Sequence, residues 1–325
     1  MKQVLLGETG LEVSELSFGT LILGKLQADL TPEEAEPAIA KAVELGINFF
    51  DTAQSYDTQR HLGLGLGRAV NDVVVATKTH ARTRKQAQKA FEESLKALKR
   101  DYIDIYHCHL IQGADDLAGR REVLDYLLEL KEQGLIRATG ASVHKVEGAQ
   151  VVAAEPDFDI LFPVLNSRGL GIPDGSLEEM LEACRAARKN GKGIYAMKPL
   201  AGGHLRASPE KAFNFLRDLE VVDSICTGMK SPAEVEMNVS IFEGREVSEA
   251  ILAQVETVPR TLKIYSRCIG CGSCVEACDQ GALSLDYTQA DESVGKKAQS
   301  VVDVSKCIVC GYCAEVCPEF VIRVV

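Results

Sequence analysis

The chain has 325 residues, a formal net charge of −11 and 46% apolar residues, a composition that is ordinary for a globular protein. This acidic balance argues against a surface for nucleic acid or anionic lipid, and no apolar run approaches the ~20 residues that span a bilayer. The first ten residues, MKQVLLGETG, interrupt their short apolar stretch with Gly7 and Glu8, unlike a signal peptide. The sequence therefore predicts a cytoplasmic protein that binds neither nucleic acid nor membrane.

The first 242 residues alternate short β-branched apolar runs with longer amphipathic stretches. The predicted strands cover residues 15–20, 47–53, 73–79, 102–109, 136–142, 160–166, 193–200 and 224–229, and clear helix patterns cover residues 31–45, 83–98 and 177–189. Eight strands, each followed by a helix, favour the α/β class and a (β/α)₈ TIM barrel. The preceding QVLLGETGLEVSE predicts a β-hairpin, which we expect to plug the bottom of the barrel.

A second domain follows the barrel. Residues 247–256 form one more helical stretch, which Pro259 ends, and the remainder contains two copies of a cysteine-rich unit. The sequence thus predicts a barrel domain with one extra helix over residues 1–258 and a small α+β domain over residues 259–325.

Eight of the eleven cysteines lie between Cys268 and Cys317, in two runs with the spacing C-x₂-C-x₂-C-x₃-C. In a reducing compartment such a cluster indicates metal ligands rather than disulfides. Zinc sites prefer separated C-x₂-C pairs over runs of four, so a pair of zinc sites is the weaker interpretation of these cysteines. The remaining cysteines are expected to be small buried hydrophobic residues: Cys108, Cys184 and Cys226.

The two cysteine runs resemble a bacterial two-cluster ferredoxin domain over nearly all of residues 260–325. The resemblance implies two [4Fe-4S] clusters, with the fourth cysteine of each run bound to the other cluster. One cluster would use Cys268, Cys271, Cys274 and Cys317, and the other Cys307, Cys310, Cys313 and Cys278. Asp279 replaces the usual proline after the first run, whereas Pro318 follows the second. A loop is inserted around residues 288–300.

Four side chains in the barrel part fall at the predicted C-terminal ends of strands, where barrel active sites are built. They are Asp51, Tyr56, Lys78 and His109, in the stretches GINFFDTAQSYDTQ, VVVATKT and YIDIYHCHL. With GETGLEVSELSFGT, LKEQGLIRATGAS and GMKSPAEVEMN, these stretches resemble the aldo-keto reductase family over most of residues 1–242. The resemblance implies that the four residues are a catalytic tetrad.

The chemistry of carbonyl reduction suits these residue types. A ketone that accepts hydride also needs a proton, and a tyrosine can supply one. We expect Lys78 to lower the pKa of Tyr56, Asp51 to hold Lys78, and His109 to orient the carbonyl oxygen. His107 points the same way as His109 on its strand, one layer deeper, and is expected to be a hydrogen-bonded core histidine rather than a metal ligand.

The family resemblance also implies a coenzyme site. Its positions here are Gly19, Thr20, Ser142, Asn166, Met197, Lys198, Leu200, Gly202, Gly203, Gly228, Met229, Lys230, Ser231, Glu234 and Asn238. The loops PLAGG and TGMKSP keep the glycines and helix start of a phosphate cradle, which suits a dinucleotide or FMN.

Several of the coenzyme contacts of the family are altered in this chain. Val143 replaces half of the carboxamide clamp, Phe162 replaces a glutamine, and Met197 replaces the aromatic residue that stacks on nicotinamide. Glu234 replaces the arginine that holds the 2′-phosphate of NADPH, and a carboxylate repels phosphate unless Lys230 or Lys198 compensates.

The resemblance to both families predicts an iron–sulfur oxidoreductase that reduces or oxidises a small carbonyl/alcohol pair with NAD(P)H, while its clusters exchange electrons with an external carrier. That carrier would be a ferredoxin, a flavodoxin or a reductase complex. One alternative is an FMN-containing or cluster-driven reductase without nicotinamide, because hydride moves two electrons and a cluster moves one. Another is an electron-transfer subunit whose barrel is mainly a docking body. The cluster domain is expected to lie near the barrel mouth.

Overall fold

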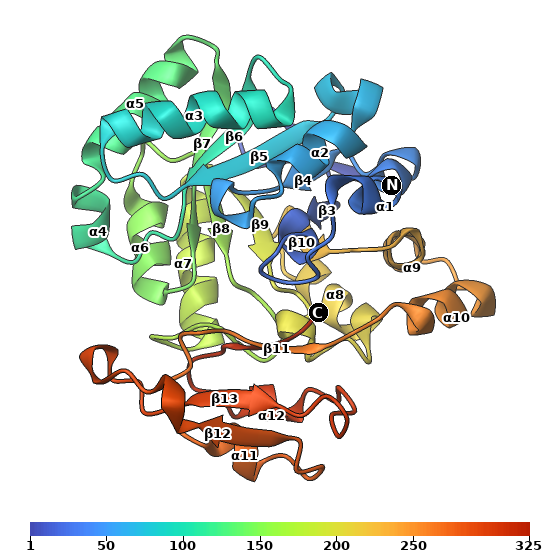
Figure 1. Ribbon diagram of the computed structural model, residues 1–325. Helices are drawn as coiled ribbons and strands as arrows, with labels where there is room; N and C mark the ends of the chain where they lie inside the picture. The colour runs from blue at the N-terminus through green and yellow to red at the C-terminus, as the bar shows by residue number, and fades with distance from the viewer.

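The computed structural model describes residues 1–325 and contains a closed barrel of eight parallel strands surrounded by helices (Figure 1). Each strand pairs with its neighbours in chain order, and β10 closes the barrel against β3. The strands are β3 (Leu16–Gly19), β4 (Phe49–Asp51), β5 (Val74–Thr79), β6 (Ile103–Cys108), β7 (Ile136–Val143), β8 (Ile160–Pro163), β9 (Gly193–Met197) and β10 (Ser224–Gly228). The predicted TIM barrel is confirmed.

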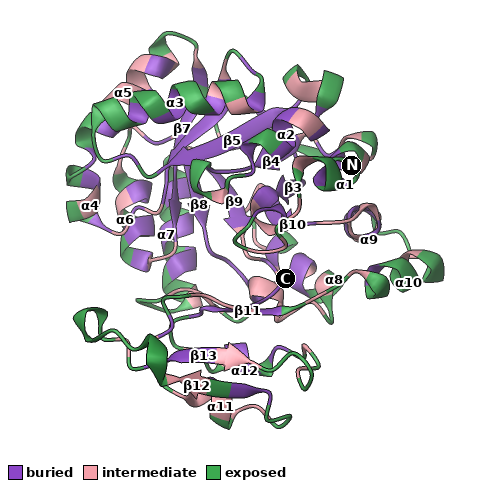
Figure 2. Cartoon of the chain, in the orientation of Figure 1, coloured by how far each residue is buried: buried purple, intermediate pink, exposed green.

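Helices cover the outside of the barrel, with buried faces toward the strands and exposed faces outward, except for the last, α10, which is mostly exposed and packs against α9 (Figure 2). They are α1 (Pro32–Glu44), α2 (Gln59–Gly65), α3 (Arg84–Leu98), α4 (Ala114–Ala118), α5 (Arg121–Glu132), α6 (Val146–Ala154), α7 (Leu177–Lys189), α8 (Pro209–Arg217), α9 (Pro232–Phe242) and α10 (Glu249–Thr257). The side chains of Thr31 and Ser176 cap the first turns of α1 and α7 in full capping boxes. None of these helices has the length and apolar character of a membrane span.

The N-terminal hairpin of β1 (Gln3–Leu5) and β2 (Glu12–Ser14) closes one end of the barrel. Its residues Leu6 and Leu11 are buried in one cluster with the inward side chain of Phe49. Gly7 has a left-handed φ of 55°, and a Cβ there would come within 2.2 Å of the backbone nitrogen of Gly193 at the start of β9. The hairpin is therefore the predicted plug at the N-terminal ends of the strands.

The small domain consists of two short antiparallel sheets and two single-turn helices. Its elements are β11 (Leu262–Ile264), α11 (Ser273–Glu276), β12 (Leu283–Asp286), β13 (Gln299–Val302), α12 (Tyr312–Glu315) and β14 (Ile322–Val324). β11 pairs with β14, and β12 pairs with β13. Residues 287–298, most of the expected inserted loop, connect β12 to β13 through the short 3₁₀ turns η5 (Tyr287–Gln289) and η6 (Glu292–Val294).

The small domain lies at the C-terminal ends of the barrel strands, with β11 along the seam (Figure 1). The Nζ of Lys263 donates to the carbonyl of Lys25 at 2.9 Å, in the loop after β3. Arg168, in the loop after β8, forms an ion pair with Glu315 of α12. Since these loops surround the mouth of the barrel, the domain occupies the end of the barrel at which the candidate tetrad was predicted.

Two predicted strands end earlier than expected. The runs predicted to reach residues 166 and 200 end at Pro163 and Met197, because Val164 and Met197 form only an isolated bridge. Lys198 then takes a left-handed φ of 59°, which turns the chain away from the strand direction.

Candidate active site and iron–sulfur sites

Asp51, Lys78, His109 and Tyr56 come together at the mouth of the barrel. Asp51 ends β4, Lys78 lies in β5, His109 directly follows β6, and Tyr56 ends the short 3₁₀ turn η2 (Gln54–Tyr56). The Nζ of Lys78 lies 2.6 and 2.7 Å from the two carboxylate oxygens of Asp51, and the rings of Tyr56 and His109 meet edge to face at 5.5 Å. The strand ends thus bring the four candidate residues together.

The ammonium group of Lys78 is fully used by its own surroundings. It donates to both oxygens of Asp51 and, at 2.7 Å, to the carbonyl of Thr52, which accounts for its three N–H groups. Its Nζ lies 4.9 Å from the ring centroid of Tyr56. Lys78 therefore holds Asp51 and the backbone, and no proton of its ammonium group is left for the tyrosine hydroxyl.

The environment of Tyr56 differs from our expectation. Burial, followed by the negative charge of Asp51, raises the pKa of Tyr56 well above 10. The prediction that Lys78 lowers this pKa is wrong for this structure, because the ammonium charge is already paired with Asp51. Tyr56 is therefore a protonated hydroxyl at neutral pH, suited to donate a proton to a carbonyl oxygen.

His109 is neutral in this site. Burial, followed by the positive charge of Lys78, lowers the pKa of His109 well below 6.5. Its ring stacks on His80 at 4.1 Å, and its Nδ1 lies 3.5 Å from the hydroxyl of Ser55. A neutral imidazole has one N–H to donate, which is what positioning a carbonyl oxygen requires. His80 was not predicted, because nothing in its local sequence distinguishes it from a loop residue.

A buried hydrogen-bond chain lies beneath the tetrad. The hydroxyl of Tyr195 donates to Asp51 at 2.9 Å and lies 2.7 Å from the Nε2 of His107. His107 is thus the hydrogen-bonded core histidine that we predicted. Its ring has room because residue 140 is glycine: a Cβ there would come within 2.4 Å of the His107 Nδ1. The position of Tyr195, two residues before Met197 on β9, was the available signal for an inward side chain.

The predicted coenzyme positions on the first strands make packing contacts or bond to the chain itself. A Cβ on Gly19 would come within 2.9 Å of the Cys226 sulfur, and the hydroxyls of Thr20 and Thr58 bond at 2.7 Å. Ser142 accepts a bond from the backbone nitrogen of Leu110 at 2.9 Å.

Asn166 uses both ends of its amide within its own loop. Its Nδ2 donates to the carbonyl of Leu170, and its Oδ1 accepts from the backbone nitrogens of Arg168 and Leu170. These three bonds fix the amide to its own loop and leave one N–H of Nδ2 without an assigned partner.

Met197 ends β9, and the loop after it contains Lys198, Leu200 and the pair Gly202–Gly203. Met197 is half-buried at the strand end, Leu200 packs against the barrel core, and the Nζ of Lys198 bonds the Nε2 of His144 at 2.9 Å. Gly202 and Gly203 have left-handed φ values of 69° and 96° and lie against the C-terminal strand of the small domain.

The two glycines of this expected phosphate cradle face the chain itself. A Cβ on Gly202 would come within 2.6 Å of the Arg323 Cδ, and one on Gly203 within 2.7 Å of the Val324 carbonyl. The space that the glycines leave open is therefore filled by β14.

The polar side chains of the loop after β10 also bond to other residues of the chain. Ser231 caps α9, and Glu234 accepts from the backbone nitrogen of Lys230 at 2.8 Å and pairs with Arg260 at 3.4 Å. The Nζ of Lys230 donates to the carbonyl of Pro259 at 2.6 Å. The other predicted positions pack inward: Gly228 lies against Ile22, Met229 is fully buried, and Asn238 is 2% exposed. Together with the filled cradle, these contacts do not fit a dinucleotide at this position.

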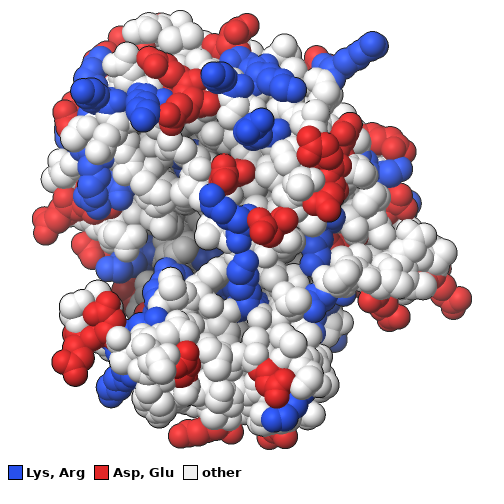
Figure 3. Space-filling view, viewed as in Figure 1, with Lys and Arg blue, Asp and Glu red and all other residues white.

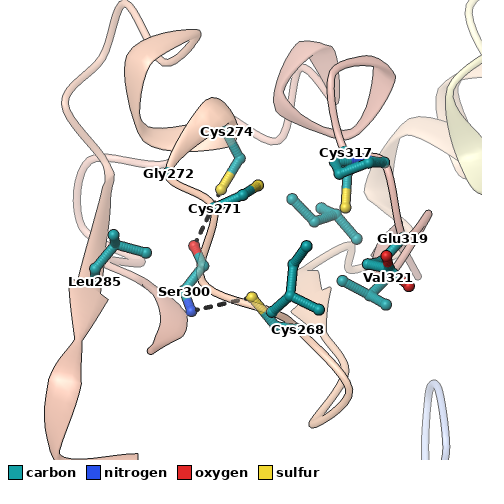
Figure 4. A pocket seen from close by; sticks show the side chains of 12 residues that line it. Cys268, Cys271, Gly272, Cys274, Leu285, Ser300, Cys317, Glu319 and Val321 are labelled. Atoms are coloured by element: carbon teal, nitrogen blue, oxygen red, sulfur yellow. Dashed lines mark hydrogen bonds between the residues drawn. The ribbon is translucent and has the colours of Figure 1, made fainter. Parts of the chain in front are cut away.

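The eight predicted ligand cysteines line two separate cavities. One contains Cys268, Cys271, Cys274 and Cys317, whose sulfur atoms converge in Figure 4, and the other contains Cys278, Cys307, Cys310 and Cys313. In both cavities the fourth cysteine of one run meets the first three of the other run. Four thiols around one space are the donor set of a [4Fe-4S] cluster, so the residues fit the group.

The first cavity also offers hydrogen bonds to sulfur. The backbone nitrogens of Gly270 and Ser300 lie 3.4 Å from the sulfur of Cys268, and the hydroxyl of Ser300 lies 3.3 Å from that of Cys274. Donors of this kind stabilise negative charge on cysteine sulfur and tune the potential of a bound cluster.

Comparison with known proteins supports the family assignments of both the barrel and the small domain. The family model described as "Aldo/keto reductase family" matches residues 15–225, and the one described as "4Fe-4S dicluster domain" matches residues 267–321. L-galactose dehydrogenase of Arabidopsis thaliana is 27% identical, over 79% of this chain and 94% of its own. Methylglyoxal reductase DkgA of Yersinia pestis is 26% identical, over 71% of this chain and 86% of its own. The solved aldo-keto reductase AKR11C1 of Bacillus halodurans, 23% identical, superimposes with a TM-score of 0.64 over 79% of this chain and 95% of its own, and supports the fold.

Proposed function

We propose, from the premise that the chain belongs to the aldo/keto reductase family, that it is an iron–sulfur oxidoreductase that interconverts a small carbonyl compound and its alcohol. Its electrons would pass to and from an external carrier through two [4Fe-4S] clusters. The observation that carries this proposal is the place of the small domain, whose strand β14 fills the Gly202–Gly203 loop at the barrel mouth. The two relatives, named as a galactose dehydrogenase and a methylglyoxal reductase, support a carbonyl/alcohol pair.

The chain's residues would divide the work as follows. His109 donates a hydrogen bond that orients the carbonyl oxygen, and Tyr56 gives that oxygen a proton. Lys78 and Asp51, as a buried ion pair, fix the floor of the site. When bound, each cluster carries one electron at a time, so reduction of one carbonyl takes two electrons from the reduced carrier and two protons; Tyr56 would supply the proton for oxygen, and solvent water the proton for carbon.

The external carrier would meet the second cysteine cavity. Beside its exposed Cys310, the side chains of Ile308 and Tyr312 are 64% and 67% exposed. Apolar and aromatic side chains around a redox centre suit a weak, transient contact with a small electron carrier. A ferredoxin, a flavodoxin or a reductase complex would fit this role.

The second candidate is an NAD(P)H-dependent reductase with the clusters serving an additional exchange. The assembled tetrad favours it, because NADP is the coenzyme typical of this family. It requires Arg323 and Val324 to leave the Gly202–Gly203 loop and Glu234 to release Arg260. An electron-transfer subunit with an inert barrel is less well supported, since an inert barrel has no need of a buried Lys78–Asp51 pair at its mouth.

An anaerobic titration distinguishes these functions. Protein with both clusters is titrated with NADH and then NADPH, while the broad iron–sulfur absorbance is followed, and dithionite gives full reduction. We expect that neither NADH nor NADPH bleaches the clusters and that the protein does not oxidise NAD(P)H when carbonyl compounds are added. Consumption of NADPH by carbonyls would instead establish the second candidate.

A further inference from the structure

Lys198 has a side-chain amine with no anionic partner at the barrel mouth. Its side chain makes one polar contact, at 2.9 Å to the Nε2 of His144 in the loop after β7, and it belongs to no ion pair. Because an ammonium group only donates, His144 must be the acceptor and neutral at this nitrogen. The left-handed φ of 59° at Lys198 directs this side chain away from the strand. Such a conformation in a non-glycine residue suggests a functional demand on its position.

The small domain adds an aromatic wall beside Lys198. Phe320 has a left-handed φ of 47°, although the first cysteine run has Gly281, with a φ of 57°, at the matching position. Its ring fills the space beside Gly171, where a Cβ would come within 2.7 Å of it, and the Nζ of Lys198 lies 5.7 Å from its centroid. A phenylalanine with a left-handed φ, at a position where the other repeat has glycine, also suggests a functional demand on its position.

Arg323 places a second cation on this wall. Its guanidinium carbon lies 3.7 Å from the ring centroid of Phe320, and the residue is 5% exposed. One N–H group donates to the carbonyl of Ile322 at 2.9 Å, and no carboxylate pairs with the group. A guanidinium with N–H groups that no carboxylate takes can bind a planar oxyanion.

These cations are contiguous with the candidate active site. His109 and His144 directly follow β6 and β7, which are neighbouring strands of the barrel, and the backbone nitrogen of Leu110 donates to the hydroxyl of Ser142 at 2.9 Å between them. Burial, followed by the charges of Arg323 and Arg267, lowers the pKa of Lys198 because no acidic group offsets them, and an anion bound beside Lys198 would favour its charged ammonium form. Figure 3 shows Lys and Arg side chains gathered along the furrow between the two domains, although the chain as a whole carries a net charge of −11.

We propose that Lys198, positioned by His144, and Arg323 form an oxyanion site, walled by Phe320, that binds a carboxylate group of the carbonyl substrate. This inference rests on the proposed function and narrows the substrate to a carboxylate-bearing carbonyl compound, such as an oxo acid. A dinucleotide phosphate is a poor occupant, because Arg323 and Val324 fill the Gly202–Gly203 loop. A bound carboxylate would supply the countercharge that Lys198 and Arg323 lack.

A different role for these cations would be to balance the charge of the first cluster. Arg267 directly precedes Cys268, and the charge of Cys317 affects Arg323, so these two arginines suit that role. Lys198 and His144 do not: both belong to barrel loops, and no cysteine is among the charged groups that act on them. Lys198 is therefore the residue that separates the two explanations.

The test is anaerobic titration calorimetry of the full chain with its clusters. Three probes are used: pyruvate (a carboxylate beside a carbonyl), methyl pyruvate (the same carbonyl without charge) and inorganic phosphate. Pyruvate should bind at least tenfold more tightly than methyl pyruvate. The Lys198→Gln variant should lose about tenfold to hundredfold in pyruvate affinity, the effect of removing one charged hydrogen bond. Lys211→Gln, an exposed lysine on α8, should change nothing.

Three other results of the calorimetry would overturn the oxyanion site. Equal binding of pyruvate and methyl pyruvate, no binding of any probe at millimolar concentration, and no effect of Lys198→Gln would each do so. Binding of phosphate alone, abolished by NADPH, would assign the cations to a nucleotide and likewise overturn it. Because binding is measured without turnover, Lys198-dependent pyruvate binding with no carbonyl reduction would leave the site in place and remove the proposed function.

Discussion

The Nζ of Lys78 lies 2.6 Å from one carboxylate oxygen of Asp51 and 2.7 Å from the other, with both side chains almost completely buried. A buried pair of this kind is costly to break from one side, because the remaining charge has no solvent and no partner. The pair therefore makes the floor of the candidate site rigid, and it links the site to the stability of the barrel.

Asp51→Asn should lower the free energy of unfolding by about 3–5 kcal/mol, since it leaves the Lys78 ammonium buried without its countercharge. The measurement is anaerobic urea unfolding of the protein with its clusters, followed by circular dichroism. The exposed pair Lys25–Asp57 provides the control, and Lys25→Met should leave the unfolding midpoint unchanged. Equal effects of the two variants would contradict the assigned role of the buried pair.

The raised pKa of Tyr56 predicts how carbonyl reduction depends on pH. A proton donor stays active while pH is below its pKa, so the rate of reduction should not fall between pH 7 and pH 10 through loss of this proton. Tyr56→Phe should lower the rate by about 10²- to 10⁴-fold at every pH in this range. The measurement is the rate of alcohol formation with a chemically reduced carrier. A decline of the wild-type rate around pH 7 that Tyr56→Phe abolishes would show that the tyrosine pKa is lowered instead.

Much of this architecture could be predicted from the sequence because its signals are local. The eight strand–helix units, the hairpin plug, the tetrad at strand ends and the cysteine spacing all follow from residues close together in the chain. The state of Tyr56 could not be predicted, because it depends on whether the Lys78 ammonium points at Asp51 or at the tyrosine. The contacts of Lys198 with His144 and Phe320 join three distant segments, and no periodicity signals them.

The surroundings of the expected coenzyme positions could not be predicted from the sequence either. Gly202 and Gly203 match a phosphate cradle by residue type, but their environment is set by β14, more than a hundred residues later. Asn166 matches by type as well, and its amide is used to close the loop to Leu170. A residue type is visible in the sequence, whereas the group that already occupies its hydrogen bonds is visible only in the fold.

Comparison of the two cysteine runs predicts backbone strain at Val309. Gly270 and Val309 occupy matching positions with left-handed φ values of 70° and 54°, a conformation that a β-branched residue adopts only under strain. Val309→Gly should therefore raise the free energy of unfolding by about 1 kcal/mol. Ile308→Gly, at the neighbouring exposed position, should lower it by about 0.5–1 kcal/mol. Thermal unfolding of both variants under anaerobic conditions tests this, and a lower melting temperature for Val309→Gly would refute it.

The exposed apolar side chains beside the second cysteine cavity predict where electrons enter. Replacing Ile308 and Tyr312 together by serine should slow electron exchange with a reduced ferredoxin or flavodoxin several-fold, because their exposed apolar surface contributes to docking. Reduction by dithionite, a small molecule that needs no docking surface, should be unchanged. Stopped-flow absorbance measures both rates. If the two reductants slow equally, the substitutions have altered the cluster rather than the contact.

In the proposed function, the clusters and the tetrad form one redox unit. The most direct measurement reduces the clusters with dithionite, removes the excess, and mixes the protein anaerobically with pyruvate while the iron–sulfur absorbance is recorded and lactate is quantified. We expect that the absorbance recovers, that one lactate forms per two electrons, and that Tyr56→Phe slows both processes by about 10²-fold or more. Clusters that stay reduced, or that reoxidise equally fast in Tyr56→Phe without lactate, would contradict it.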